Sequence, residues 1–586
     1  MIKTFQIYHQ NEGCEIELQE QVISATLSEW HISVRFATPT VPSVISLKGY
    51  FPCRDVYTVW GPSMGFNPSL GYSWSKRTTS SRLASGAPVH ALLAQSGHNR
   101  LIFALSDAAT PHEIASGVLE EDGTLECSIR LFTRPISAIT AYEVTLRIDT
   151  ADRPFYEAVA EVENWWAEKC GYPRAYVPEA AKLPVYSAWY SFHQRTIPEE
   201  ILEQCRLSKE LGLDVLIVDD GWQTEDGSRG YAFCGDWEVC EKKIPDMKAF
   251  VDAVHAEGMK FVLWYSVPFV GVQTEMYKRF SDKVLGHYSG QGDLRWTCLD
   301  PRYPDVREAL IDIYRRAMLD WGLDGFKLDF IDSFALSSEE SFAFDERRDT
   351  QSLEEGVDRL LDGITKALRA INPEVLIEFR QSYIGPVIRK YGNMFRVGDC
   401  PADPMKNRVM GVQLRYLLKG SAVHSDMLMW HYEDTPEAAA KEVIPTLITV
   451  PQISVLLDKV PESHRRMLKN YLSFWRAHRE TLLEGKLEAE HPESDYSLVR
   501  TERDGELIAI AYLPVVLTVK GNVDSAILIN GSSESTLAVR FEKGTTRMKW
   551  RIYDCEGDLV EEGVIMGAGI DDYDVPESGR IEFSVM

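Results

Sequence analysis

The heptapeptide at residues 324–330, D-G-F-K-L-D-F, carries the residue types in this chain best suited to chemistry. It follows a predicted amphipathic helix at 304–321 that ends at a glycine. Residues 325–329 predict a short strand, on which Lys327 and Asp329 stand two positions apart and therefore point to one face. A buried carboxylate and ammonium are costly unless they are paired or used. The pair is either a satisfied core ion pair or part of a catalytic site.

The elements around this heptapeptide alternate between strand and helix. Aliphatic runs predict strands at 185–192, 215–218, 260–265, 325–329, 375–379, 394–397, 423–429 and 453–457. Helical patterns lie at 197–211 (with Thr196 as N-cap), 247–257, 304–321, 352–371, 409–419, 436–450 and 462–478. Eight such units over roughly 280 residues predict an α/β fold with a central (β/α)8 TIM barrel.

In a barrel, the carboxyl ends of the strands carry the chemistry. Here these ends are rich in acids, basic residues and large aromatics: Trp189, Tyr190, Asp219, Asp220, Trp264, Tyr265, Lys327, Asp329, Glu378, Arg380, Arg396, Asp399, His424 and Asp426. Such a concentration favours a working site over an isolated core ion pair.

Asp329 and Asp399 follow the fourth and sixth predicted strands, so they should face each other across the barrel mouth. Two facing carboxyls suit a glycosidase, in which one attacks the anomeric carbon or holds a water and the other protonates the leaving oxygen. Lys327 should keep Asp329 ionised, as a nucleophile requires. Asp399 has no basic neighbour in sequence closer than Arg396, which favours it as the proton donor.

Asp219 and Asp220 end a buried aliphatic strand, where two adjacent acids repel unless a ligand supplies donors. Sugar hydroxyls are such donors, although one acid could instead cap a helix while its neighbour is solvated. The site acids could also hold a divalent cation, but no histidine accompanies them and Lys327 would oppose a cation. We therefore expect no metal and no cofactor, and no serine-hydrolase or H-E-x-x-H pattern competes.

Two β-rich regions flank the predicted barrel. Short alternating strands fill the N-terminal region, including 14–18, 30–36, 100–104, 125–132 and 139–148, and a helix at 155–169 closes it. The C-terminal region repeats this pattern at 507–512, 526–529, 535–541, 549–553 and 580–583. We expect an N-terminal β-sandwich domain at 1–180, the catalytic barrel at 181–482 and a C-terminal β-sandwich domain at 483–586.

The amino-acid composition argues against some classes of binding partner. The 586 residues include 62 basic and 88 acidic side chains, a formal net charge of −26, and no basic cluster stands out. This balance argues against nucleic acid or an anionic membrane surface and is compatible with a small carbohydrate substrate. The ten cysteines are scattered, no signal peptide is apparent and no apolar run reaches membrane-spanning length, so we expect a cytoplasmic protein. The sequence leaves homo-oligomerisation open.

Several of these motifs together resemble glycoside hydrolase family 36, the α-galactosidases, which are retaining enzymes. The motifs are D-D-G-W at 219–222, G-D-W at 235–237, V-L-W-Y at 262–265, F-K-L-D-F at 326–330 and F-R-V-G-D at 395–399. The resemblance extends to the three-part architecture, because the family has an N-terminal β-supersandwich, a barrel and a C-terminal β-sandwich.

The resemblance implies a role for each matching residue. Asp329 falls on the nucleophile and Lys327 on a lysine that touches the sugar. Asp219 and Asp220 fall on the acids that bind the galactose O4 and O6 region. Trp189 and Trp264 fall on aromatic walls of the same subsite, and Arg396 on an arginine near O2. Apart from the resemblance, we expect Arg380 and Asp426 to bind substrate because they stand at neighbouring strand ends. If the mechanism is retaining, the two catalytic carboxyls should lie roughly 5 to 5.5 Å apart.

The sequence departs from the family pattern at two places. Cys400 stands where the acid/base aspartate is expected, so Asp399, one residue early, is favoured and Asp403, three residues late, is the alternative. The run 378–381, E-F-R-Q, replaces a Cys- and Gly-rich turn that borders the sugar. Alternative functions are a β-L-arabinopyranosidase, an α-N-acetylgalactosaminidase, a transglycosylase, or a sugar-binding protein without catalysis. Trp60 or Trp74 could extend from the N-terminal region to the pocket.

Overall fold

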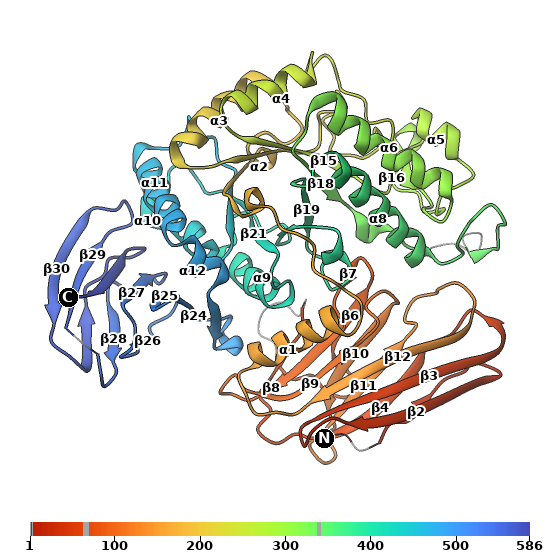
Figure 1. Cartoon of the computed structure of the whole chain (residues 1–586), viewed down its shortest axis with the longest axis horizontal. Helices are drawn as coiled ribbons and strands as arrows, with labels where there is room; N and C mark the ends of the chain where they lie inside the picture. Colours follow the sequence, from red (N-terminus) through yellow and green to blue (C-terminus); the bar gives the residue numbers. More distant parts are fainter. Residues whose placement is uncertain (1, 3, 63–68, 337–341, 546) are drawn as a thin grey trace.

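A closed barrel of eight parallel strands forms the centre of the computed structural model, which describes residues 2, 4–62, 69–336, 342–545 and 547–586 (Figure 1). Every residue of β14 and β18 is buried, as expected of strands covered on both faces. The predicted barrel is confirmed. In order around the barrel its strands are β13 (Val185–Ser187), β14 (Val215–Val218), β15 (Lys260–Ser266), β18 (Gly325–Asp329), β19 (Leu376–Arg380), β20 (Met394–Arg396), β21 (Ala422–Leu428) and β22 (Val450–Ile453).

Amphipathic helices cover the outside of the barrel (Figure 1). In the longest of them, Leu353–Ile371, the Ser352 hydroxyl accepts a hydrogen bond from the Glu355 amide at 3.2 Å and fixes the first turn. The helix before β18 ends at Gly322, whose φ of 76° suits a residue without a side chain. The covering helices are α3 (Pro198–Leu211), α4 (Met247–Ala256), α6 (Pro304–Trp321), α8 (Leu353–Ile371), α9 (Pro404–Leu417), α10 (Pro436–Val443) and α11 (Glu462–Ala477).

The structure corrects two of the predicted strands. The predicted strand at 185–192 ends at Ser187 and is followed by a one-turn helix, α2 (Trp189–Phe192), so Trp189 lies just beyond the strand. The eighth strand, β22, begins at Val450, three residues before the start of the predicted segment at 453–457. Its Gln452 pairs in register with Val185, and this polar residue hid the strand from a search for apolar runs.

Three helix predictions also need correction. Helix α10 stops at Val443 rather than at residue 450, because Pro445 has no N–H to donate; a 3-10 turn, η5 (Ile444–Thr446), follows. Helix α9 begins at Pro404, five residues before the predicted start. Thr196 does not cap α3, whose N-cap is Ile197; its hydroxyl donates to the Gly221 carbonyl at 3.4 Å.

Two six-stranded sheets form the N-terminal region and enclose a core of their own. Residues of both sheets fill this core, for example Val34 and Phe103 from one and Leu47 and Ile129 from the other. The five strands predicted here are confirmed, and helix α1 (Phe155–Glu168) follows them. The sheets comprise β1 (Gln6–Tyr8), β4 (Ile45–Pro52), β11 (Thr124–Leu131), β10 (His112–Val118), β6 (Arg77–Arg82) and β7 (Ser85–Gly86), and β2 (Cys14–Val22), β3 (Leu27–Thr40), β12 (Ile139–Asp149), β9 (Asn99–Leu105), β8 (Val89–Leu93) and β5 (Thr58–Trp60).

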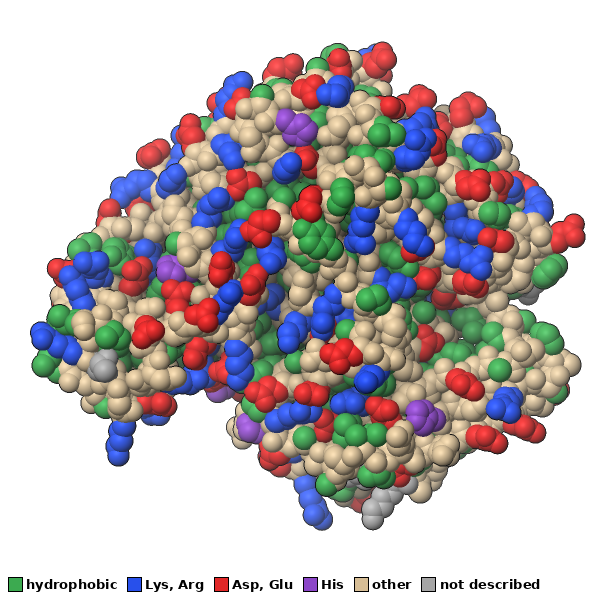
Figure 2. Space-filling view, in the orientation of Figure 1, with side chains coloured by type: hydrophobic (Ala, Val, Ile, Leu, Met, Phe, Trp, Pro, Cys, Tyr) green, Lys and Arg blue, Asp and Glu red, His purple; other side chains and the backbone are tan. Residues whose placement is uncertain are grey.

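The C-terminal region packs a seven-stranded sheet against a three-stranded one. Helix α12 (Arg479–Glu484) leads from the barrel into it, and a notch separates it from the N-terminal sheets at the lower edge of Figure 2. The five predicted strands are confirmed within a larger set. The sheets comprise β23 (Lys486–Glu490), β24 (Leu498–Arg503), β25 (Glu506–Ala511), β27 (Ser525–Asn530), β32 (Arg580–Val585), β29 (Met548–Tyr553) and β30 (Leu559–Ile565), and β26 (Val516–Val519), β28 (Leu537–Phe541) and β31 (Gly569–Tyr573).

Acidic and basic side chains are intermixed over the face that Figure 2 displays. Among the helices that the structure describes, none has both the length and the apolar run needed to cross a bilayer.

A buried ion pair joins the N-terminal region to the barrel. Glu163 of α1 is fully buried and accepts from the guanidinium of Arg389, which is also fully buried and lies between β19 and β20. The Arg174 Nε donates to the same carboxylate at 2.9 Å. Burial lowers the pKa of Arg389, and Glu163 opposes this effect. The carboxylate therefore balances two guanidinium groups at the junction.

We expect Glu163→Gln to destabilise the protein by about 3 kcal/mol, because removing one partner leaves a buried charge uncompensated. The measurement is the midpoint of thermal or urea unfolding. Glu161→Gln is the matched control on the same helix: Glu161 is half exposed and its nearest arginine nitrogen is 3.9 Å away, so its midpoint should hardly move. Equal shifts for the two variants would contradict the assignment.

Candidate active site

The predicted site residues gather at the carboxyl ends of neighbouring barrel strands. Asp219 follows β14, Trp264 lies on β15, Lys327 and Asp329 on β18, and Arg380 on β19. Parallel pairing sets Trp264 beside Lys327 and Arg380 beside Arg396, so side chains from distant parts of the chain meet at one end of the barrel.

Asp329 lies at the centre of this group, with only 6% of its surface exposed. Its Oδ1 accepts from Arg380 Nε at 2.8 Å, from the Tyr383 hydroxyl at 2.5 Å and from the Phe330 amide at 2.8 Å. Its Oδ2 accepts from the Trp264 indole N–H at 3.0 Å. One carboxylate oxygen is therefore crowded with donors, while the other has a single protein donor among the described contacts.

These donors keep Asp329 ionised. Burial alone would raise the pKa of its carboxyl, but the charges of Arg380 and Lys327 and the hydrogen bonds from Tyr383 and Trp264 together hold the pKa far below its ordinary value. Sequence reasoning assigned this effect to Lys327 alone. In the structure Arg380 acts more strongly.

Lys327 pairs directly with Asp219, whose Oδ2 lies 2.5 Å from the Lys327 Nζ. Both side chains are buried, so the interpretation of Asp219 and Asp220 as a cap and a solvated neighbour is wrong. Asp220 accepts from Gln194 Nε2 at 2.6 Å and from Gln223 Nε2 at 2.7 Å.

The pKa of Asp220 is raised to about 6. Burial is the main cause, and the neighbouring Asp219 adds to it, while the two glutamine hydrogen bonds oppose the shift. Neither glutamine carries charge, and among the described residues no basic side chain forms an ion pair with Asp220. A ligand that donates hydrogen bonds would favour its ionised form.

Arg396 connects three acids from different strands. It is buried, pairs with Asp426 through Nη1, donates from Nη2 to Asp399 Oδ1 at 2.9 Å, and lies 3.8 Å from Glu378 Oε1. Asp426 is itself fully buried and also accepts from the Tyr190 hydroxyl at 2.9 Å. The structure thus places Asp426 behind the site, as a partner of Arg396.

Asp399 is the exposed member of this network, with 58% of its side chain open to solvent. Burial raises its pKa, but Arg396 above all, with Lys327 and Arg380, lowers it below the ordinary value. The argument that Asp399 lacks a close basic partner is therefore wrong. Asp403 instead caps α9, accepting from the Lys406 amide at 3.0 Å.

Aromatic side chains surround the carboxylates. Trp264 is buried against Trp237, at 5.9 Å between ring centroids, and against Tyr231, at 6.3 Å. Trp189 is half buried and lies against the Arg229 guanidinium, 5.8 Å from its ring centroid. Trp264 thus holds Asp329 through its N–H, while Trp189 remains partly open at the end of β13.

The N-terminal sheets contact the site through the β6–β7 hairpin rather than through either predicted tryptophan. The Gly86 amide donates to the Ser382 carbonyl at 3.0 Å, and Arg82 Nη1 donates to the Phe334 carbonyl at 2.8 Å. Trp60 is buried and donates to the Tyr496 hydroxyl at 3.0 Å. Trp74 is 71% exposed and stacks on Tyr72, so neither tryptophan is placed at the carboxylates.

Sequence reasoning missed Tyr383, Gln194 and Gln223, each of which touches a site carboxylate. All three lie in loops beyond strand ends, where no periodic pattern marks an inward side chain. The only signal available in the sequence was their position, three to seven residues after the end of a barrel strand. Across the described residues, no group of three or more His, Cys, Asp or Glu side chains has the spacing of a metal site.

Comparison with known proteins finds similarity in sequence over part of the chain. Residues 184–380 match the family model Melibiase. The α-galactosidase Mel36A of Lactobacillus acidophilus is 35% identical over 88 residues, which are 14% of this chain and 11% of that protein. The A type blood α-D-galactosamine galactosaminidase of Flavonifractor plautii is 28% identical over 135 residues, 20% of this chain and 12% of that protein. These alignments thus span about a tenth of the relatives' length.

The fold match extends further than the sequence match. The GH36 α-galactosidase AgaA from Geobacillus stearothermophilus superposes with a TM-score of 0.63 at 14% identity, covering 100% of this chain and 87% of that one. AgaA variants have been solved in complex with stachyose and with raffinose. The segment that matches the family model runs from β13 to Arg380 and includes Asp219, Lys327 and Asp329. Over residues 184–380, from β13 to β19, this chain therefore matches the melibiase family.

Proposed function

We propose that this protein is a retaining, exo-acting glycoside hydrolase that releases terminal α-galactose-type sugars by double displacement. The observation that carries the proposal is the buried, ionised Asp329 at the end of β18, held by Arg380, Tyr383 and Trp264. A buried carboxylate that stays ionised at the end of a barrel strand suits a nucleophile. The melibiase match and the α-galactosidases among the relatives support the sugar and the anomeric configuration.

In the first step, Asp329 attacks the anomeric carbon through Oδ2, the oxygen with fewer protein donors, while Asp399 protonates the leaving oxygen. The glycosyl-enzyme ester then forms, and Asp399 as carboxylate activates a water that releases the sugar. Asp219 and Asp220 accept hydrogen bonds from sugar hydroxyls. Lys327, between Asp219 and Asp329, balances the charge of both acids.

The capping role of Asp403 supports Asp399 as the acid/base. The Asp403 carboxylate accepts a hydrogen bond from the Lys406 amide of α9, whereas Asp399 extends from the loop after β20 toward solvent. The cytoplasmic location stays a prediction; all ten cysteines are free thiols.

Asp329→Asn should lower turnover of an aryl α-galactoside by roughly 10⁴-fold or more, because the amide cannot form the covalent intermediate. The measurement is kcat of the parent protein and of the variant, and their unfolding midpoints show whether the variant is folded. Asp332→Asn is the control: this acid lies three residues later and accepts from the Ser382 hydroxyl at 3.1 Å, so activity should change only a few-fold. Near-normal turnover by Asp329→Asn would reject the nucleophile.

Asp399→Ala should slow cleavage of raffinose by roughly 10² to 10⁴-fold, the usual contribution of a general acid. A very good leaving group departs without protonation, so glycosylation by such a substrate should slow far less. Added azide should restore turnover of this substrate, because azide can attack the glycosyl-enzyme from the α face in place of water and needs no general base. Asp403→Asn, which keeps a good N-cap, should leave both substrates within a few-fold. The reverse ranking of the two variants would assign the acid/base to Asp403.

Binding of free galactose should weaken as the pH falls through about 6. Below this value Asp220 gains a proton and loses acceptor capacity for sugar hydroxyls, so Kd should rise by up to roughly tenfold per pH unit. Calorimetric titration from pH 8 to 5 would detect the change. In the Asp220→Asn variant this rise in Kd below pH 6 should disappear. If the rise persists, another group controls the pH dependence of binding.

A further inference from the structure

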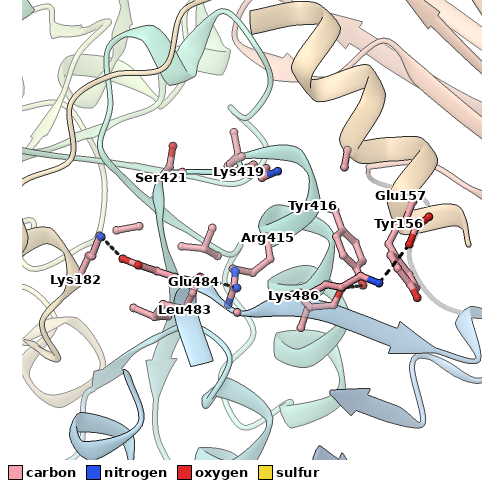
Figure 3. Close-up of a pocket in the computed structure, with 17 residues that line it drawn as sticks. Tyr156, Glu157, Lys182, Arg415, Tyr416, Lys419, Ser421, Leu483, Glu484 and Lys486 are labelled. Atoms are coloured by element: carbon pink, nitrogen blue, oxygen red, sulfur yellow. Dashed lines mark hydrogen bonds and ion pairs between the residues drawn. The ribbon is translucent and has the colours of Figure 1, made fainter. Parts of the chain in front are cut away.

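A cavity with a volume of about 600 Å³ lies at the opposite end of the barrel from the site carboxylates (Figure 3). Ala422, where β21 begins, lines the cavity, whereas Asp426 at the catalytic end lies four residues further along the same strand. Helix α1 and the segment between α12 and β23 complete the wall. The volume is in the range of small-molecule sites. Its apolar lining comprises Ala160, Leu418, Ala422, Val423, Leu483 and Leu487.

Ion pairs flank this apolar lining. Lys182 pairs with Glu484 at 2.6 Å on one side, and Lys486 lies 3.3 Å from Glu157 on the other, as Figure 3 shows. These four charges cancel in pairs. They frame the cavity without giving it a net charge.

Two further basic residues line the cavity without a carboxylate of their own. Arg415 donates to the carbonyls of Ile448, Leu482 and Leu483, which satisfy its hydrogen bonds but supply no negative charge. Lys419 is exposed and makes no hydrogen bond or ion pair with any described residue. The lining therefore holds four basic and two acidic side chains, an excess of two positive charges in a chain with a net charge of −26.

Burial lowers the pKa of Arg415 to about 10, and the nearby Glu484 carboxylate, which already pairs with Lys182, opposes this effect only in part. The protein therefore compensates the Arg415 charge incompletely. An anion in the cavity would provide that compensation, and the six aliphatic side chains would cover an apolar body. We propose that this cavity binds a small organic carboxylate with an apolar body, its head group directed to Arg415 and Lys419.

Calorimetric titration of the intact protein with decanoate tests the proposal, with decanol as the neutral molecule of the same chain length. Decanoate should bind at one site per chain, saturating galactose should not displace it, and decanol should bind at least tenfold more weakly. Lys419→Glu should weaken decanoate binding at least tenfold. Lys543→Glu makes the same charge change at an exposed lysine of the C-terminal region and should stay within twofold.

Ala160→Trp provides an independent check, since a large side chain on α1 would fill the cavity without altering its charges. This variant should lose decanoate binding while keeping the unfolding midpoint and galactose affinity of the parent. The proposal is overturned if the parent protein shows no saturable binding, if decanol binds as tightly as decanoate, or if Lys419→Glu and Lys543→Glu bind decanoate equally.

Discussion

The need to keep one buried carboxylate charged determines how the barrel mouth is built. Asp329 has lost nearly all contact with water, and removing an ion from water without compensation is prohibitive inside a protein. Its compensation comes from Trp264 on β15, Arg380 on β19 and Tyr383 beyond it, together with the Phe330 amide. Three strands must therefore hold their register for a single acid to stay ionised.

The same requirement extends outward from Asp329. Lys327 contributes charge to Asp329 but hydrogen-bonds to Asp219, which makes the two strands electrostatically dependent on each other. Tyr383 lies in the loop that the N-terminal hairpin contacts at Ser382, so the N-terminal sheets support a donor to Asp329 through the backbone of a neighbouring residue. This arrangement gives the N-terminal region a positioning role that depends on backbone contacts and not on an aromatic side chain.

The sequence predicted elements whose signal is local and missed those set by tertiary contacts. The aliphatic run of β14 and the glycine that ends α6 can be recognised from the sequence alone. Strand β22 could not be recognised in this way, because it contains the buried polar residue Gln452. The Gln452 amide donates to Glu378 at 2.6 Å, a partner 74 residues away in the sequence. The acids at strand ends were visible as a pattern, yet the contacts of Gln194 and Tyr383 depend on loop paths that no periodicity encodes.

The two arginines explain how adjacent acids can take different roles. Among the described residues Arg380 forms an ion pair with Asp329 alone, so protonating that acid would remove the main negative charge beside a largely buried cation. Arg396 also pairs with Asp426 and lies near Glu378, so Asp399 can take up a proton while Arg396 remains balanced. Asp399 is also open to solvent, from which a proton can come. The roles that we propose for Asp329 and Asp399 would thus depend on how many acids each arginine pairs with, and not on the distance between either acid and a cation.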